Sequence, residues 1–191
     1  FRVNTRKEAT LQQSLEVKFQ YSDQDSNETY LGLTEADFAN SPYDRYAASQ
    51  VDNIQTEHVQ IMVSHTLDFS KNMRLTTQAY HNKFSRNWYK LNDVTSNGEK
   101  ASIADILSRP EQFSTHMAII RGEEDSEDNA FGVRANNRNY YSQGVQSKFD
   151  FHWYGDQTFH DLEVGARYHY DEEDRFQWDD KFNIINGVMN L

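Results

Sequence analysis

The chain has 191 residues, two prolines, no cysteine and a formal charge of −11 at pH 7. Its acidic balance argues against a nucleic-acid-binding protein, because binding phosphate groups requires a cationic surface. A membrane helix needs about 20 consecutive apolar residues, and the longest apolar stretches, such as residues 117–120, are far shorter. The absence of cysteine fits an oxidising compartment, although many cytosolic domains also lack it. The first residues show no initiator Met and no signal-peptide pattern, so we expect the chain to begin inside a longer protein.

Alternating apolar and polar residues predict a first strand over residues 13–22, with Leu15, Val17, Phe19 and Tyr21 on one face. Four further segments are predicted as strands on similar grounds, at 58–69, 73–91, 139–153 and 158–171. Strands of a membrane barrel alternate lipid-facing and lumen-facing residues and need only about 9–11 residues to cross. The low mean hydropathy of −0.91 therefore does not exclude a membrane protein.

The connections between these strands alternate in length. Those at 70–72 and 154–157 are short, whereas those at 23–55, at 92–137 and after 171 are long. Short turns at one end and long loops at the other are typical of transmembrane barrels, and two or three such long loops are hard to place in a compact soluble domain. The sequence thus predicts an all-β, antiparallel transmembrane barrel segment of about five strands.

Smaller features support this arrangement. Tyr21, Tyr168 and Tyr170 fall at strand ends that open into long loops, and Phe69 and Trp153 fall next to short turns, as expected for the aromatic girdles at the two membrane interfaces. A short helix is predicted within 101–108, because Ile103, Ile106 and Leu107 have helical spacing before Pro110. The pair Asn186-Gly187 predicts a small hairpin within the last loop.

The third predicted strand leaves two alternatives open. Tyr80, Phe84, Arg86 and Trp88 share one parity, opposite to that of Leu75 and Ala79. Either a bulge near Ala79 switches the two faces of the strand, or the aromatic set lines the lumen beside Arg86.

Several segments resemble the TonB-dependent receptors of the ferric citrate type, and the similarity extends over most of residues 13–180. The segments are Glu-Thr-Tyr-Leu-Gly-Leu-Thr at 28–34, Asp-Phe at 37–38, Pro-Tyr-Asp-Arg-Tyr at 42–46, Phe-Ser-Arg-Asn-Trp-Tyr-Lys-Leu at 84–91, Leu-Glu-Val-Gly-Ala-Arg-Tyr-His at 162–169 and Asp-Glu-Glu-Asp-Arg-Phe-Gln-Trp at 171–178. The resemblance implies that residues 1–191 are part of a 22-stranded, plugged barrel in the outer membrane of a Gram-negative bacterium.

The resemblance also implies a function and partners. These are TonB-energised uptake of a ferric chelate, such as ferric citrate or another siderophore, with the chelate, membrane lipid and TonB as partners. This sequence lacks the plug, the TonB-contacting segment and the closing strand of the family, and Leu191 is not the terminal aromatic residue expected of such barrels. Transport is therefore expected of the parent protein. Strand patterns do not fix the cargo, so cobalamin or a sugar remains an alternative.

An anionic chelate would need cations with aromatic walls around them, and the planar fork of arginine suits carboxylates. Arg86 and Arg167 are the preferred pair among the candidates. The full set of candidate ligand-binding residues is Arg86, Arg167, Arg45, Arg134, Arg138, Tyr80, Phe84 and Trp88. For each arginine, the competing interpretation is a salt bridge with one of the abundant acidic residues.

No direct metal site or cofactor is predicted, and iron would arrive as a chelate. Residues 23–34 open like an EF-hand loop, but Glu28 replaces the required Gly and Thr34 the required Glu. The acidic runs 123–128 and 171–174 are interpreted as solvated faces. The histidines lack ligand spacing and no catalytic motif occurs, so nothing predicts an enzyme. The alternative function is a soluble β-rich module that binds carbohydrate or calcium, in which the row beginning at Leu15 would pack onto a second sheet.

Overall fold

The structure is a computed structural model that describes residues 1–4 and 11–191. Its main feature is an antiparallel sheet with the strand order β1-β2-β3-β4-β6-β7-β8, to which β5 adds by pairing with β4. The strands are β1 (Arg2–Asn4), β2 (Gln12–Ser26), β3 (Asn53–Ser70), β4 (Met73–Ser96), β5 (Glu99–Ser102), β6 (Phe131–Tyr154), β7 (Phe159–Ile185) and β8 (Val188–Asn190). The helices are α1 (Glu35–Asn40), the 3-10 helix η1 (Ala47–Ser49), α2 (Ile103–Ser108) and α3 (Ser114–Arg121). Within the described residues, no helix has the length and apolar character needed to span a membrane.

The chain divides into two compact units, each built from parts of the long strands. Unit 1 consists of residues 1–23, 57–85 and 139–174, and therefore contains both short turns. Unit 2 consists of residues 24–56, 86–138 and 175–191, and contains the long connections and all the helices.

The sheet in unit 1 has two chemically different faces, which the side-chain contacts identify. On one face, Gln146 donates to Gln78 at 2.6 Å and Asn82 donates to Ser142 at 3.0 Å. On the other, the hydroxyls of Thr77 and Ser147 lie 3.0 Å apart. The side chains before and after Ala79 therefore continue to alternate between the two faces as in a regular strand. No bulge switches the faces, and Tyr80 shares the face of Gln78 and Asn82.

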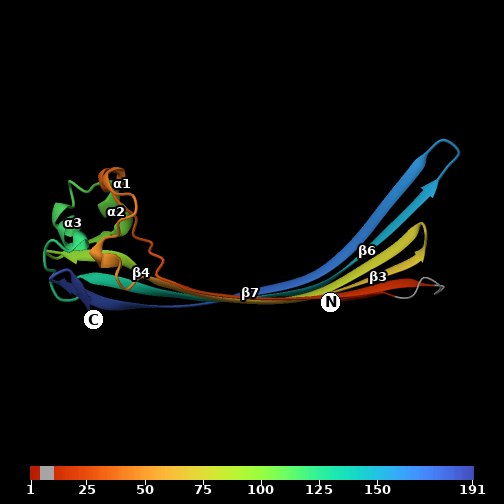
Figure 1. The fold of residues 1–191 in the computed structure, drawn as a ribbon, viewed down its shortest axis with the longest axis horizontal. Helices are drawn as coiled ribbons and strands as arrows, with labels where there is room; N and C mark the ends of the chain where they lie inside the picture. The colour runs from red at the N-terminus through yellow and green to blue at the C-terminus, as the bar shows by residue number, and fades with distance from the viewer. Residues whose placement is uncertain (5–10) are drawn as a thin grey trace. The chain divides into compact units, whose positions relative to one another are not determined.

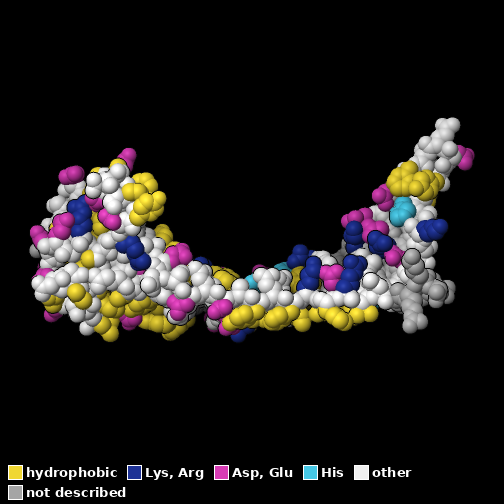
Figure 2. All heavy atoms as spheres, viewed as in Figure 1, with side chains coloured by type: hydrophobic (Ala, Val, Ile, Leu, Met, Phe, Trp, Pro, Cys, Tyr) yellow, Lys and Arg dark blue, Asp and Glu magenta, His cyan; other side chains and the backbone are white. Residues whose placement is uncertain are grey.

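Apolar side chains gather on the face of unit 1 that carries Thr77 (Figure 2). Each large apolar residue of this row is at least 38% exposed. The row comprises Leu15, Phe19, Tyr21, Ile61, Phe69, Val145, Trp153, Leu162, Val164, Tyr168 and Tyr170. Acidic and basic side chains gather on the opposite face, which we call the polar face.

Unit 2 has a conventional buried core, because its three α-helices lie together on one side of its strands (Figure 1). Ile106 and Ile120 from the helices and Leu91, Phe131 and Ile184 from the strands are fully buried. The α3 helix ends at Gly122, whose φ of 76° is the left-handed conformation favoured at helix C-termini. A side chain there would also meet Ala47 at 2.8 Å, so the helix end packs closely on η1.

Local sequence accounts for the other element ends. Ser102 caps α2 by accepting a hydrogen bond from the backbone of Asp105 at 3.2 Å, as capping serines do. The hairpin between β7 and β8 turns at Asn186 and Gly187, with φ values of 51° and 76° that match a type I′ turn.

The five predicted strands and both short turns are confirmed as β2, β3, β4, β6 and β7. The helix predicted within 101–108 is confirmed as α2, and the Asn186-Gly187 hairpin is present. The expected long loop after residue 171 is wrong, because β7 continues to Ile185. The second long loop is also shorter than predicted, because β6 begins at Phe131 with buried alternate residues. Helices α1 and α3 were not predicted.

Candidate functional site

The polar face of unit 1 brings Tyr80 and Arg167 together. Arg167 donates to the Tyr80 hydroxyl from Nη2 at 2.7 Å and from Nε at 3.1 Å, and its guanidinium carbon lies 5.6 Å from the ring centroid. The same hydroxyl lies 2.6 Å from Nδ1 of His169. Tyr80 therefore accepts hydrogen bonds from two nitrogens of Arg167, which has no ion-pair partner among the described residues.

A glycine makes this contact possible, since β6 lies between β4 and β7 in the sheet. A Cβ atom on Gly144 of β6 would meet the Tyr80 hydroxyl oxygen at 2.5 Å. The absent side chain thus opens a path along which the Tyr80 ring crosses β6 to reach Arg167 and His169.

A second aromatic group on the polar face surrounds Phe84. Its ring centroid lies 5.9 Å from that of Tyr140 and 6.0 Å from that of His58. Phe84 is thus part of an aromatic wall on the face that the sequence predicted for ligand contact. Nearby strand positions are salt-bridged instead, since Lys148 lies 3.0 Å from Glu163 and 3.1 Å from Asp150.

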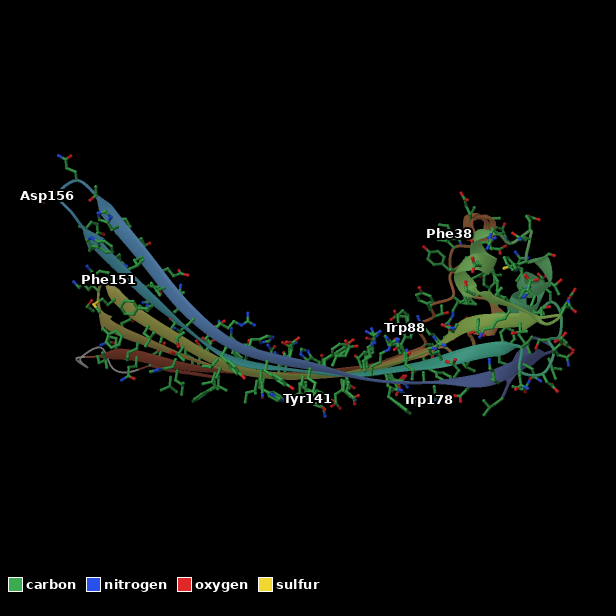
Figure 3. The ribbon with its side chains drawn as sticks, turned by 180° about the vertical axis from the view of Figure 1, so that it is seen from behind. Phe38, Trp88, Tyr141, Phe151, Asp156 and Trp178 are labelled. Atoms are coloured by element: carbon green, nitrogen blue, oxygen red, sulfur yellow. The ribbon has the colours of Figure 1, made fainter. Side chains whose placement is uncertain are left out.

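Unit 2 has a polar face of its own, with a group of cations on β4 and β6. Arg86, Trp88 and Lys90 alternate along β4, so all three project from one side of the strand. The Nε atom of Arg86 is buried and has no hydrogen-bond partner among the described residues. Figure 3 shows Trp88 on the side of the sheet that carries the helices, and Trp178 on the opposite side.

Burial and the neighbouring charges of Arg86 and Arg134 lower the pKa of Lys90, while Asp52 opposes them. Arg134 itself forms a two-point ion pair with Asp179, with distances of 2.7 and 2.9 Å. Arg86 and Arg134 therefore each lie close enough to Lys90 to repel it. We call these three residues the cation cluster.

Asp52 is a buried acid, 1% exposed, whose charge acts on Lys90. Desolvation raises the pKa of its carboxyl group. One of its oxygens accepts from the Thr29 hydroxyl at 2.6 Å and the other accepts from the Leu91 backbone at 2.8 Å. Both oxygens are used to hold the fold, so Asp52 is not placed to neutralise Arg86 or Lys90 by direct contact.

The remaining predicted arginines differ in role. Arg45 donates to the Asn27 carbonyl at 2.7 Å, to the Ser49 carbonyl at 3.0 Å and to the Ser49 hydroxyl, and so fastens the loop between β2 and β3. Arg138 lies on β6 and donates from Nε to Asn136 at 3.4 Å. The preferred pair is divided between the units, with Arg86 in unit 2 and Arg167 in unit 1.

A separate ionic group stabilises the loops of unit 2. Asp37 accepts hydrogen bonds from Tyr46 at 2.5 Å and from Arg121 at 2.7 Å, and also contacts Thr34. The hydrogen bond from Tyr46, followed by that from Arg121, lowers the pKa of Asp37 to about 2. This group links α1 to α3 and is structural, because Asp37 accepts hydrogen bonds from Thr34, Tyr46 and Arg121.

Within residues 1–4 and 11–191, no cluster of three or more histidine, aspartate or glutamate side chains is arranged to hold a metal ion. The acidic run at 123–128 instead accepts backbone and side-chain hydrogen bonds, as when Asp125 accepts from the Asn186 backbone at 2.6 Å. Residues 23–34 hold no calcium-type cluster either.

Sequence reasoning missed Lys90, His169 and Tyr30. Lys90 has the parity of Arg86 and Trp88, so alternation alone could have found it. His169 likewise has the parity of Arg167 in β7. Tyr30 lies in the loop between β2 and β3, and only the fold brings its ring to 5.5 Å from that of Trp88.

No protein-family model matches this sequence, and no curated protein matches it either. Among solved structures, the chain is similar to the crystal structure of the ferric citrate transporter FecA in the unliganded form, with a TM-score of 0.58 and 13% sequence identity. The match covers 88% of this chain and 20% of that one, so this chain spans a fifth of the transporter's length. At this identity the likeness concerns the fold alone. The open antiparallel sheet of this chain resembles part of the fold of that transporter.

Proposed function

We propose that this chain forms part of the wall of an outer-membrane β-barrel that transports a ferric chelate, with ferric citrate as the first candidate. The observation that carries the proposal is the division of the sheet into two faces, one apolar and exposed, the other polar with side chains of both charges. The fold likeness to a ferric citrate transporter supports the barrel, and the cargo is proposed from the resemblance of the sequence segments.

In this proposal the strands of unit 1 cross the membrane. Their apolar face would contact lipid, and their segments exceed the roughly 9–11 residues that a tilted barrel strand needs to cross. Both short turns belong to unit 1 and would face the periplasm, as in known barrels. The long connections belong to unit 2 and would lie outside the cell.

The exposure of the apolar row favours this proposal over a soluble binding module. In a β-sandwich the row would be covered by a second sheet. Leu15, Phe19 and Tyr21 are instead 41%, 69% and 54% exposed, and the strands described here belong to one sheet. An exposed apolar surface of this extent requires a partner, and lipid fits its continuous arrangement along the strands.

Ligand contact is proposed for the polar face. The candidates are Arg86, Arg134 and Arg138 with Trp88 in unit 2, and Arg167 with Tyr80 and Phe84 in unit 1. Arg86 is the strongest candidate, because it is the arginine with a buried and unpartnered nitrogen. Arg45 is the weakest, because its guanidinium is fully engaged with the loop.

The proposal involves no enzymatic step and no resident metal, because the iron is cargo held by its chelator. By the family resemblance, transport would draw energy from TonB. The corresponding location is the outer membrane of a Gram-negative bacterium.

The proposal is tested by deleting the gene in its own host and measuring uptake of radioactive iron supplied as ferric citrate under iron limitation. Uptake should fall, and the intact gene should restore it. Restoration with Arg86→Gln should raise the half-saturating concentration about tenfold or more, because a charge-assisted contact is lost. Arg109→Gln is the matched control, since Arg109 pairs with Asp105 on a helix. Undiminished uptake after deletion, for every ferric chelate supplied, would exclude this function.

A further inference from the structure

The ammonium group of Lys90 sits between two aromatic rings. Its Nζ atom lies 3.4 Å from the ring centroid of Tyr30 and 4.5 Å from that of Trp88. The two rings are 5.5 Å apart and nearly perpendicular, at 88°. This arrangement is an aromatic cage of the kind that binds ammonium groups by cation–π attraction.

The cage is held in place by contacts of its own. The indole Nε1 of Trp88 donates to the Glu28 carbonyl at 3.3 Å, and Thr29 binds Asp52. The two residues before Tyr30 are therefore fastened, Glu28 to Trp88 of β4 and Thr29 to Asp52. Within the described residues, Lys90 has no hydrogen-bond or ion-pair partner, so the cage is its only direct stabilisation.

The charges that face Lys90 are unbalanced. Arg86 approaches from the same strand, Arg134 from β6, and Asp52 from the segment after η1. Asp52 uses both oxygens elsewhere and Arg134 is paired with Asp179. Among the described residues, Arg86 and Lys90 thus have no ion-pair partner, and Asp52 attracts Lys90 only from a distance, in a chain whose overall charge is −11.

We propose that Lys90 is a ligand-binding residue for a polycarboxylate anion, held in the Tyr30–Trp88 cage while the site is empty and released to the ligand when it binds. Arg86 offers a planar fork to one carboxylate and Lys90 a mobile point charge to a second. The inference rests on the proposed function and narrows its substrate to chelates with at least two free carboxylate groups.

Two consequences follow. Binding removes an ammonium group from the face of the Trp88 indole, which changes the fluorescence of that residue. The bound anion also raises the pKa of Lys90, which burial and the two arginines had lowered, so binding at alkaline pH takes up a proton.

The experiment uses the intact gene product with Trp153→Phe and Trp178→Phe, which leaves Trp88 as the single tryptophan within residues 1–191, and with any tryptophan outside these residues also replaced by Phe. The protein is titrated with citrate and with gallium citrate, a stand-in that lacks the quenching of ferric iron, and emission is recorded. We expect a saturating change in emission. Lys90→Met should weaken binding about tenfold, since it keeps the length of the side chain and removes the charge.

Variants of Tyr30 separate this role from a structural one. Because the cage competes with the ligand for Lys90, Tyr30→Ala should tighten binding severalfold, whereas Tyr30→Phe keeps the ring and should leave the affinity unchanged. A merely structural cage would give weaker binding in Tyr30→Ala.

The outcomes distinguish this inference from the proposed function. Binding that is equally tight in Lys90→Met, with far-ultraviolet circular dichroism matching the parent, would overturn the role of Lys90 and leave transport standing. Failure of the parent protein to bind either citrate or gallium citrate would overturn the role of Lys90 and exclude ferric citrate as the cargo, while uptake of another ferric chelate would leave transport standing. Tight binding of an uncharged ferric hydroxamate that Lys90→Met does not weaken would overturn the polycarboxylate assignment alone.

Discussion

The hydroxyl of Tyr80 on β4 accepts a hydrogen bond from Nη2 of Arg167 on β7 at 2.7 Å, although β6 lies between the two strands. The contact spans three strands because Gly144 leaves the intervening position empty. The side chain of Tyr80 thus links β4 to β7 across β6. The stability of this part of the sheet therefore depends on Gly144, which has no side chain to make a contact of its own.

Gly144→Ala should destabilise the protein. The added Cβ would lie 2.5 Å from the Tyr80 hydroxyl and 2.6 Å from the backbone carbonyl of Tyr168, and the carbonyl cannot move aside easily. We expect a loss of about 1–3 kcal/mol, as for other overpacking substitutions. The matched control is Gly165→Ala, where the nearest atom is the Ser147 carbonyl at an ordinary 3.5 Å. That change should be neutral or stabilising by up to about 1 kcal/mol.

The measurement is urea unfolding in detergent, followed by tryptophan fluorescence. Equal midpoints for the two alanine variants would show that the Tyr80 crossing is not a constraint on the sheet.

Acid should loosen the loops of unit 2 through Asp37. The pKa of this carboxyl group is lowered to about 2, from an ordinary value of 3.8, by its hydrogen bonds to Tyr46 and Arg121. Because the folded-state pKa is the lower of the two, the contribution to stability is fully present above about pH 4. It is lost as the pH falls toward 2. Hydrogen exchange of peptides covering 34–46 and 114–123 should accelerate in that window.

Two variants check the cause of the acid response. Tyr46→Phe removes the hydrogen bond that lowers the pKa of Asp37 most, so the acid-induced rise in hydrogen exchange should move to higher pH. Asp37→Asn should give fast exchange at every pH. An acid transition that is the same in Asp37→Asn as in the parent would assign the effect to another group.

Period-two alternation predicted the long strands because their apolar rows are regular, but it failed where charge dominates. The acidic segment after Tyr170 looked like a loop, yet it belongs to β7. Gln177 donates to Asn136 at 2.7 Å and Asp179 pairs with Arg134, so contacts with β6 hold the charged segment in the sheet. Such cross-strand pairs depend on register, which a single sequence does not reveal.

The candidate site, too, could be predicted from the sequence only in part. Arg86, Trp88 and Lys90 lie on one face because they alternate in sequence, and that much can be predicted. The cage cannot, since Tyr30 lies 60 positions before Lys90 and reaches it through a loop fastened by Thr29 and Asp52. Arg45 was a reasonable candidate by residue type, and only its contacts to Asn27 and Ser49 identify it as structural.

The end of the sheet should depend on Gln50. Its amide nitrogen donates to the Gly187 carbonyl at 2.6 Å and its oxygen accepts from the Met189 backbone at 3.4 Å. Gln50 therefore pairs with the outer edge of β8 much as a neighbouring strand would. Gln50→Glu replaces the donor by an oxygen facing a carbonyl, and should cost about 1–3 kcal/mol of local stability.

Limited proteolysis of the 183–191 hairpin measures this effect, with cleavage expected sooner in Gln50→Glu. Gln24→Glu is the control, because Gln24 makes an exposed contact with Ser26 at 3.0 Å. Equal cleavage rates in the two variants would refute the anchoring role.

The two faces of the sheet predict different responses of the tryptophans to lipid. Trp153 belongs to the exposed apolar row of unit 1, where it stacks on His160 at 4.8 Å beside a short turn. Trp88 lies on the polar face of unit 2. In single-tryptophan variants of the intact gene product reconstituted into vesicles, lipids brominated near the headgroup should quench Trp153 strongly and Trp88 weakly, since bromine quenches only on close approach. A soluble carbohydrate-binding module would show no quenching at either position, and comparable quenching of both would place the polar face in lipid and refute the proposed orientation.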